Sequence, residues 1–322
     1  MNRLLQAKIE TEEIREKELY FFIKEMEKKK RRKIEDLLML IERFLIQHEI
    51  VKAEDLMKAL TVEEGLKYYK QYHIYYESKE ALLRDLLNEQ FKTLNQALLK
   101  DMDTFLYQSM LNSQLYFSYS LDKHFLKHTT IQPLSQLELE DLLTQPFLEN
   151  HYSKRLEKIH KNFTLDTLDT LKASLKEEKT IKQTVKQCKD FLNQQDYQLE
   201  RLIITEESFY FNEVNHALYE KNEIDYYQFL STLDKKTSSQ CKNMDLKVFK
   251  TTEAQIGMNK PPLHVNCRST TIPFIEGLTE DSERAFKLDD NKTQITSNMN
   301  YHEWYKTFYK KDVKKIEKKN EN

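Results

Sequence analysis

Residues 226–274 read YYQFLSTLDKKTSSQCKNMDLKVFKTTEAQIGMNKPPLHVNCRSTTIPF, and their composition differs from the rest of the chain. The runs YYQFLSTLD, KVFK and STTIPFI are rich in aromatic and β-branched residues, which favour strands. Three of the five prolines and one of the three glycines lie within 225–276, and both residue types mark turns. The segment 225–276 is therefore predicted to be a small α+β unit with two or three short strands.

Before this segment the sequence is typical of long helices. Residues 1–130 contain no proline and one glycine. We expect helix breaks near Gly65 and near Ser78, with Ser78 as an N-cap whose hydroxyl accepts a first-turn amide. Apolar residues recur at helical spacing, in a first stripe of Leu37, Leu38, Ile41, Phe44 and Leu45 and a second series of Leu82, Leu83, Leu86, Leu87 and Phe91.

Further helices are expected after residue 130. Pro133 and Pro146 flank a short helix, LSQLELEDLLTQ; a helical stretch with a break in the 160s follows, and then helices at roughly 180–195 and 196–221. The predicted fold class is mostly α, with long N-terminal and central helices followed by a small α+β unit containing Cys and His. We expect three regions: a helical region 1–145; a domain 146–276, made of helices in 146–224 and the core 225–276; and a polar tail 277–322 with a short helix at Trp304.

Composition excludes several classes of protein. With 51 Lys and Arg against 53 Asp and Glu, the formal net charge is -2, so the chain as a whole lacks the basic character of a nucleic-acid-binding protein. Three glycines are too few for a glycine-rich phosphate loop, a propeller or a many-turned sandwich. Three cysteines do not make a disulfide framework, which favours a reduced intracellular setting. No signal peptide and no apolar run of 18 residues is visible.

Cys241, His264 and Cys267 are the best candidates for chemistry. Thiolate and imidazole are the ligands that zinc prefers, and the two-residue gap in His264-x-x-Cys267 lets both reach one ion. A structural zinc site needs four ligands. Ser238 occupies the first position of what would be a Cys-x-x-Cys knuckle, and His216 or Asp234 could supply the fourth ligand. Zinc is therefore a candidate cofactor, and the alternative is a hydrogen-bonded histidine beside two packed thiols.

A Cys–His or zinc-dependent hydrolase is a more remote alternative for the same residues. If residues 264–267 are extended, His264 and Cys267 point to opposite faces, and the sequence shows no oxyanion element. We expect no catalytic residues. Asp234 and Thr237 are expected to form a turn, because aspartate accepts nearby backbone amides.

A short basic run, KEMEKKKRRK at residues 24–33, is the candidate DNA contact. The residues in question are Lys28, Lys29, Lys30, Arg31, Arg32 and Lys33. A second lysine-rich stretch lies near the C-terminus, at 306–319. The alternative for the first run is a solvated helix face, because acidic residues flank it closely.

The motif of residues 226–274 resembles the phage head morphogenesis family, the Mu F-like minor head proteins of tailed phages, including those of Gram-positive bacteria. The resemblance rests on the order and spacing of Asp234, Thr237, Cys241, Met244, Asp245, Pro261, Pro262, His264, Asn266, Cys267 and Arg268. Thr205 and Glu206 resemble a Thr-Glu pair on the family's preceding helix, and Tyr301 with Trp304 resembles a C-terminal Tyr-x-x-Trp. The resemblance covers roughly 146–308.

This resemblance implies a non-enzymatic minor capsid protein that acts in head morphogenesis. The implied partners are the portal protein and other head proteins, capsid and scaffold, with packaged double-stranded DNA as a further candidate and no membrane. The implied location is the virion head, and the host cytoplasm during assembly. The motif residues and Trp304 would have a structural role, in which Arg268 pairs with Asp234 or Glu206. A DNA-binding protein of the phage head or prophage is the alternative.

The chain departs from the family pattern at three positions. Leu246 stands where glycine is common, so we expect the turn there not to depend on glycine. Ser238 replaces a cysteine, and Val265 replaces a proline. The Ser238 departure in particular leaves the zinc ligand set one short.

Overall fold

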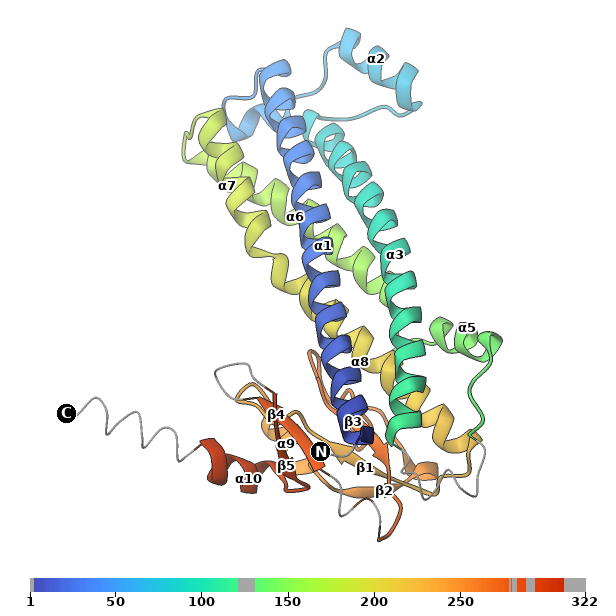
Figure 1. The fold of residues 1–322 in the computed structure, drawn as a ribbon. Coiled ribbons are helices and arrows are strands. Elements are labelled where there is room, and N and C mark those ends of the chain that lie inside the picture. Colours follow the sequence, from blue (N-terminus) through green and yellow to red (C-terminus); the bar gives the residue numbers. More distant parts are fainter. Residues whose placement is uncertain (1–2, 121–130, 278, 280–282, 288–292, 310–322) are drawn as a thin grey trace, which may run out of the picture. The chain divides into compact units, whose positions relative to one another are not determined.

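A computed structural model describes residues 3–120, 131–277, 279, 283–287 and 293–309 (Figure 1). The chain divides into two compact units. The helical unit comprises Phe21–Met102 and Tyr152–Glu200, and the mixed unit comprises Met1–Tyr20, Asp103–His151 and Arg201–Asn322. The boundary between them falls inside three helices: α1 (Arg3–Gln47), α3 (Lys79–Ser120) and α8 (Asp196–Lys221). No described helix is apolar enough over a sufficient length to cross a membrane.

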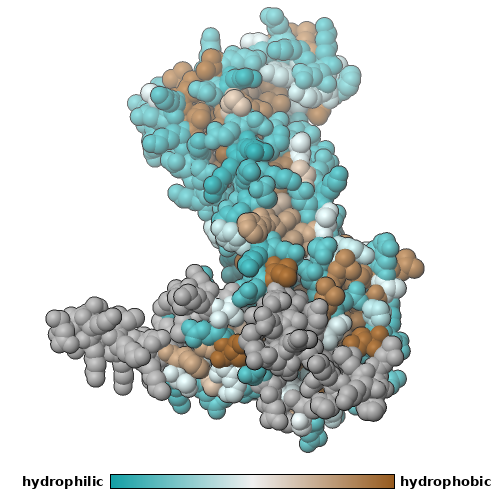
Figure 2. Space-filling model, viewed as in Figure 1, coloured by the Kyte–Doolittle hydropathy of each residue, from teal (hydrophilic) through white to brown (hydrophobic). Residues whose placement is uncertain are grey.

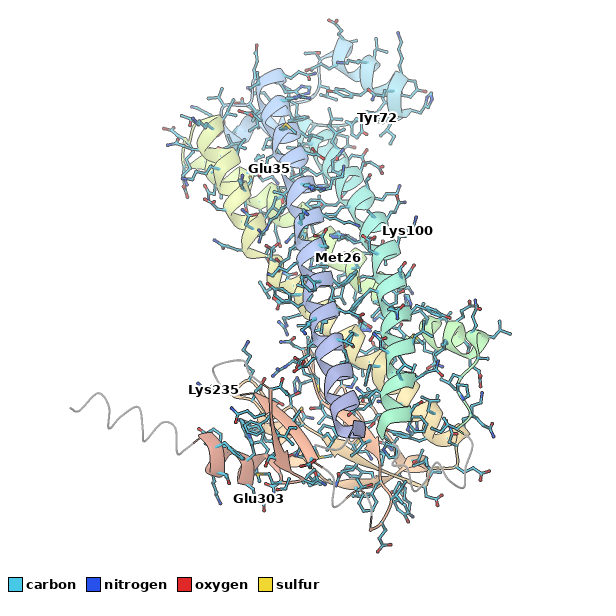
Figure 3. All side chains as sticks on the ribbon, in the orientation of Figure 1. Met26, Glu35, Tyr72, Lys100, Lys235 and Glu303 are labelled. Atoms are coloured by element: carbon cyan, nitrogen blue, oxygen red, sulfur yellow. The ribbon has the colours of Figure 1, made fainter. Side chains whose placement is uncertain are left out.

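Helical spacing of apolar residues builds the core of the helical unit. Besides its parts of α1, α3 and α8, this unit contains η1 (Ala53–Met57), α2 (Val62–Tyr72), α6 (Tyr152–Lys176) and α7 (Ile181–Gln194). The predicted α1 stripe is buried throughout, and in the α3 series only Leu86 is more than marginally exposed. Met26 is buried among the helices (Figure 3), while hydrophilic residues cover most of the visible surface of this unit (Figure 2).

Capping side chains mark the helix starts. The Ser78 hydroxyl accepts the Ala81 amide at 3.2 Å, which confirms the predicted N-cap of α3. Thr180 and Gln183 form a capping box at the start of α7, and α7 and α8 follow the predicted 180–195 and 196–221 within two residues. The short helix between the two prolines is α5 (Gln136–Thr144), capped by Ser135.

Two predicted helix breaks are wrong. Gly65 lies inside α2, which begins with a capping box between Thr61 and Glu64, and the chain breaks earlier, after α1. The cap offsets the low helix propensity of one glycine, about 1 kcal/mol. No break occurs in the 160s, because α6 runs unbroken from Tyr152 to Lys176 and its apolar residues at helical spacing, among them Phe163, Leu168 and Leu171, are buried.

The mixed unit contains a three-stranded antiparallel sheet in the order β2-β1-β3. The strands are β1 (Tyr226–Leu230), β2 (Val248–Lys250) and β3 (Thr270–Pro273), which match the three predicted runs. In the register, Tyr227 pairs with Phe249 of β2 and with Pro273 of β3. Helix α8 packs on this sheet, since the hydroxyls of Tyr219 and Thr271 lie 2.9 Å apart. The predicted mostly α fold with a small α+β Cys/His unit is confirmed.

A second antiparallel pair follows the sheet in the same unit. It consists of β4 (Glu283–Lys287) and β5 (Thr293–Ser297), and α10 (Tyr301–Trp304) with the π-helical turn η3 (Tyr305–Tyr309) comes after it. Trp304 is fully buried, in a cluster with Leu233, Phe286 and Tyr301. The lysine-rich residues 310–322 lie outside the described residues.

Leu246 turns the chain into β2. Its φ of 61° lies in the left-handed region, its amide bonds to the Phe229 carbonyl at 2.8 Å, and the Phe229 amide bonds back to Lys247 at 2.9 Å. The turn therefore forms without glycine, with leucine in a conformation that glycine adopts more readily. The two ladder bonds fix the turn, and the left-handed conformation costs a non-glycine residue about 1–2 kcal/mol.

We expect Leu246→Gly to leave the free energy of unfolding of the mixed unit within about 1 kcal/mol of the wild type, because relief of backbone strain offsets lost packing and glycine entropy. Leu246→Val is expected to lower it by about 1–3 kcal/mol, because a β-branched residue is strained in this region. Urea unfolding followed by fluorescence of Trp304, the single tryptophan, measures both. A valine variant as stable as the glycine variant would contradict this assignment.

A buried ion pair joins the β4–β5 pair to the sheet. The two terminal nitrogens of Arg284 each donate a hydrogen bond to the Asp245 carboxylate at 2.9 Å. The side chain of Arg284 is 5% exposed and that of Asp245 is 0% exposed. The same guanidinium donates to the carbonyls of Ser231 and Met299 at 2.8 Å. The carboxylate also accepts the amides of Ser231 and Tyr301. Both terminal nitrogens of the guanidinium and both oxygens of the carboxylate thus have partners, which a buried pair requires.

Arg284→Met should lower the free energy of unfolding of the mixed unit by about 3–5 kcal/mol, because it leaves the Asp245 carboxylate buried without its cation. The matched control is Lys250→Met, which removes an exposed lysine that pairs with Glu253 at 3.4 Å and should cost about 0.5 kcal/mol or less. Equal effects of the two variants on urea unfolding would show that the Arg284 pair does not hold the unit together.

Candidate metal centre

Cys241, His264 and Cys267 converge in the mixed unit. One ligand atom from each residue, the two Sγ atoms and a histidine nitrogen, lies within 4.8 Å of the others. The Cys241 Sγ is 3.2 Å from the His264 Nε2 and 3.7 Å from the Cys267 Sγ. Both sulfurs are buried among Phe229 and Leu263, whereas the histidine is half-buried. All three cysteines of the chain are free thiols.

Helix α9 (Ser239–Met244) positions the first sulfur. Ser238 is its N-cap, and the Ser238 hydroxyl accepts the Cys241 amide at 3.2 Å. The same hydroxyl oxygen lies 2.7 Å from the His264 Nε2. The serine that stands where a knuckle cysteine would be is thus a direct neighbour of the three candidate ligands.

A tight turn positions the other two ligands. The Cys267 amide bonds to the His264 carbonyl at 3.2 Å, and Asn266 adopts a φ of 65°, which asparagine tolerates better than most residues. The Thr205 hydroxyl of α8 accepts the Asn266 amide at 2.8 Å. Because the segment turns instead of extending, His264 and Cys267 face the same cluster, and the opposite-face arrangement predicted for an extended segment does not occur.

The hydrogen bonds of His264 assign its tautomer. Its Nδ1 lies 2.9 Å from the Val265 carbonyl, which can only accept, so Nδ1 carries the proton of the neutral ring. The Nε2 lone pair is then directed at Cys241 and Ser238. This is the arrangement of a metal-binding histidine, in which a backbone carbonyl orients the ring.

The two cysteine sulfurs are electrostatically unequal. The hydrogen bond shared with Cys241 lowers the pKa of the Cys267 thiol, and backbone hydrogen bonds of Ser269 and Leu263 contribute to the lowering. The same shared hydrogen bond, with burial, raises the pKa of Cys241. A lowered pKa favours the thiolate at Cys267, and the thiolate is the form of cysteine that binds metals.

Asp234, Thr237 and Arg268 form a second cluster. The two Arg268 nitrogens bond to the two Asp234 oxygens at 2.5 and 2.9 Å, so of the two partners considered for Arg268 the structure shows Asp234. One carboxylate oxygen also accepts the amides of Lys236 and Thr237 and the Thr237 hydroxyl. This is the expected aspartate turn, closed by an arginine fork.

The remaining motif residues lie around these clusters. Glu206 is fully buried on α8, and Pro261 and Pro262 are buried and joined by a cis peptide bond. Trp304 belongs to the separate apolar cluster of α10. His216 lies between Tyr219 and Tyr227, with its Nε2 3.5 Å from Glu220. Among the described residues, neither His216 nor Asp234 joins the three candidate ligands.

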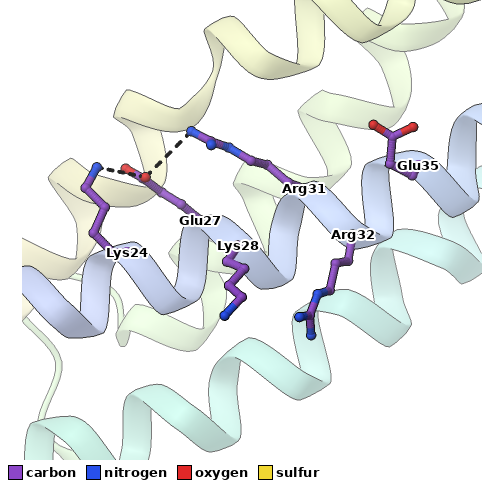
Figure 4. Close-up of a pocket in the computed structure, with 6 residues that line it drawn as sticks. All are labelled: Lys24, Glu27, Lys28, Arg31, Arg32 and Glu35. Atoms are coloured by element: carbon purple, nitrogen blue, oxygen red, sulfur yellow. Dashed lines mark hydrogen bonds and ion pairs between the residues drawn. The ribbon is translucent and has the colours of Figure 1, made fainter.

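The basic run on α1 is paired with acidic residues of the helical unit. Lys30 is buried and bonds to Asp196 at 2.8 Å, and Lys29 pairs with Asp101. Burial lowers the pKa of Lys30 despite this partner. Arg31 and Lys24 both contact Glu27 (Figure 4), in a shallow pocket lined by Lys24, Glu27, Lys28, Arg31, Arg32 and Glu35. Lys28 lies 3.4 Å from Glu25 and Lys33 3.6 Å from Asp36.

Two contacts of the site escaped sequence reasoning. Ser238 was singled out only as a missing cysteine, although its spacing from Cys241 is the signal that places it here. Arg284, which fixes Asp245 of the motif, lies in a polar stretch whose composition gives no sign of a buried cation.

Comparisons with known proteins identify one family. The family model described as Phage Mu protein F like protein matches residues 166–272, about a third of the chain. The match runs from within α6 to β3 and includes all the candidate ligands. Searches of curated proteins and of solved structures found no match. The resemblance to the Mu F-like family is confirmed over the matched residues, and for 146–165 and 273–308 it stays a prediction.

The Asp234–Arg268 pair predicts a pH dependence. Burial alone would raise the pKa of Asp234, but the hydrogen bonds and charge of Arg268 outweigh it and leave the pKa lowered. A carboxylate with a lowered pKa stabilises the fold above its unfolded pKa of about 4, and that contribution is lost as pH falls through the lower folded value. Asp234→Asn should therefore cost about 2–3 kcal/mol at pH 7, and the difference from wild type should shrink below pH 4.

Urea unfolding at pH 3 to 7, followed by Trp304 fluorescence, measures this difference. Glu253→Gln is the control, because that carboxylate is largely exposed and its loss should change little at any pH. A constant difference between Asp234→Asn and wild type across this range would rule out the pair as its source.

Proposed function

We propose that this chain, which carries a Phage Mu protein F like domain over residues 166–272, is a minor head protein of a tailed phage. In this proposal it acts in head morphogenesis at the portal vertex and is packaged in the virion head. The main support for the proposal is that the residues matched by the family model form a folded core. The matched residues supply α7, α8, the three-stranded sheet and the Cys241 and Asp234 clusters.

A structural role is favoured over an enzymatic one. The Mu F-like family is a family of structural phage proteins. In addition, the sulfurs of Cys241 and Cys267 belong to residues 2% and 0% exposed, so neither presents an accessible nucleophile, as a Cys–His hydrolase requires. Instead, the Cys241 thiol is hydrogen-bonded to the His264 imidazole and to the Cys267 thiol inside a packed cluster.

The proposed partners are other phage head proteins: the portal protein first, with capsid and scaffold proteins. The host cytoplasm is the proposed location during assembly. Direct contact with packaged DNA is the less favoured proposal, since Lys28, Lys29, Lys30, Arg31 and Lys33 each lie within 4.0 Å of a carboxylate in the same unit. Phosphate contact requires cations that are free to replace counterions.

Quantitative mass spectrometry of purified procapsids and mature particles tests this proposal. We expect the chain in both, at a few copies per particle, measured against the portal and major capsid proteins as internal standards. Cross-linking of intact procapsids should join lysines of this chain to the portal protein. Presence in procapsids alone would remove the claim that it is packaged, and absence from both kinds of particle would overturn the proposal.

A further inference from the structure

We propose that Cys241, His264 and Cys267 bind one zinc ion, with the Ser238 hydroxyl beside the fourth coordination position. The proposal does not depend on a role in phage heads. It rests on four independent features of the cluster: the ligand separations, the orientation of the imidazole, the surroundings of the sulfurs and the place of Ser238.

The separations of the ligand atoms fit a tetrahedral zinc site. Two thiolates bound at about 2.3 Å with a tetrahedral angle lie about 3.8 Å apart, and the Sγ atoms of Cys241 and Cys267 are 3.7 Å apart. A disulfide would bring them to about 2.05 Å. A thiolate and an imidazole nitrogen on the same ion lie about 3.6 Å apart, and the Cys241 Sγ to His264 Nε2 distance is 3.2 Å. The third separation, between the Cys267 Sγ and a His264 nitrogen, is at most 4.8 Å.

The imidazole is already oriented for a metal. Its Nδ1 proton is donated to the Val265 carbonyl, which leaves the Nε2 lone pair directed toward the Cys241 sulfur and the Ser238 hydroxyl. A neutral histidine in solution populates two tautomers, and the hydrogen bond to the Val265 carbonyl favours the one protonated at Nδ1. Zinc bound at Nε2 would therefore need no reorganisation of this ring.

The surroundings of the sulfurs favour a soft divalent cation. Phe229 and Leu263 pack around the two cysteines, and the cysteine residues are 2% and 0% exposed. An apolar shell of this kind controls solvent access to a metal site and the dielectric around it. Two sulfurs and one nitrogen select zinc over magnesium or calcium, which require oxygen ligands. On binding, both thiols release their protons to solvent.

Ser238 leaves the ligand set one thiolate short. Its hydroxyl oxygen is 2.7 Å from the His264 Nε2 and accepts the Cys241 amide, so it lies next to two of the three ligands. Among the described residues, no fourth Cys, His, Asp or Glu joins the cluster. We infer that this hydroxyl, directly or through one water, completes the tetrahedron. A cysteine at this position would supply the fourth thiolate without moving the backbone.

The first test is the metal content of the full chain, purified under reducing conditions without a metal-chelating column. Plasma mass spectrometry should find one zinc per chain. After chelation, addition of Co²⁺ should produce the intense thiolate-to-cobalt absorption and the visible bands of a tetrahedral site, and zinc should displace them. Removal of zinc should also lower the Tm, because metal-binding energy contributes to the stability of the folded state.

Variants then assign the ligands. Cys267→Ala, Cys241→Ala and His264→Ala should each lose stoichiometric zinc. Ser238→Ala should keep zinc but bind it about tenfold more weakly or worse, the usual effect of losing an outer partner, whereas Ser238→Cys should bind it more tightly than the wild type. The matched control is Cys188→Ala, which removes a buried thiol of α7 in the helical unit and should keep one zinc per chain.

The Ser238→Cys variant and the wild-type cobalt spectrum keep the test decisive even if a ligand variant fails to fold. A wild-type chain that is free of zinc when purified and gives no thiolate-to-cobalt band would overturn the proposal. So would a mass two units lower together with loss of two reactive thiols on unfolding, which would indicate a Cys241–Cys267 disulfide. Zinc retained in full by Cys267→Ala would place the ion elsewhere.

Discussion

One hydrogen bond between a helix and a turn organises the candidate site. The Thr205 hydroxyl of α8 accepts the Asn266 amide and donates to the Arg201 carbonyl of its own helix. It thereby holds Asn266 in a left-handed conformation that an unrestrained chain visits rarely. This turn sets the directions of the side chains on either side of Asn266. His264 and Cys267 face Cys241, and Arg268 contacts Asp234.

Buried ion pairs hold the rest of the mixed unit around this turn. Arg15 bonds to Glu207 at 2.7 and 2.9 Å, and Ser109 donates to the same carboxylate. Lys260 pairs with Glu213 just before the motif turn. Such pairs add little net stability when compared with apolar residues of the same shape, but each allows only one partner geometry. They therefore fix which helix lies against which loop more than they raise the free energy of unfolding.

Local patterns predict the elements well and their interruptions poorly. Helical spacing and capping residues located α5, α7 and α8, and aromatic runs located the three strands, because these signals act between neighbours in sequence. Gly65 and the 160s were misjudged because a capping box and an unbroken apolar stripe outweighed single-residue propensity. The Leu246 and Asn266 conformations depend on bonds to Phe229 and Thr205, distant residues that composition cannot pair in advance.

Charge pairing likewise depends on residues that are distant in sequence. These distant partners determine how the basic run at residues 28–33 is interpreted. Counted along the sequence, residues 28–33 are six consecutive cations. In the fold, Asp101 and Asp196 are brought to Lys29 and Lys30 from 72 and 166 positions away, and Lys30 is removed from solvent altogether. A cation that is buried or held by a carboxylate is less able to neutralise a phosphate and so to release the counterions condensed on DNA. The net charge of -2 therefore predicted the character of this surface better than the local basic run did, because folding places acidic residues beside the basic ones.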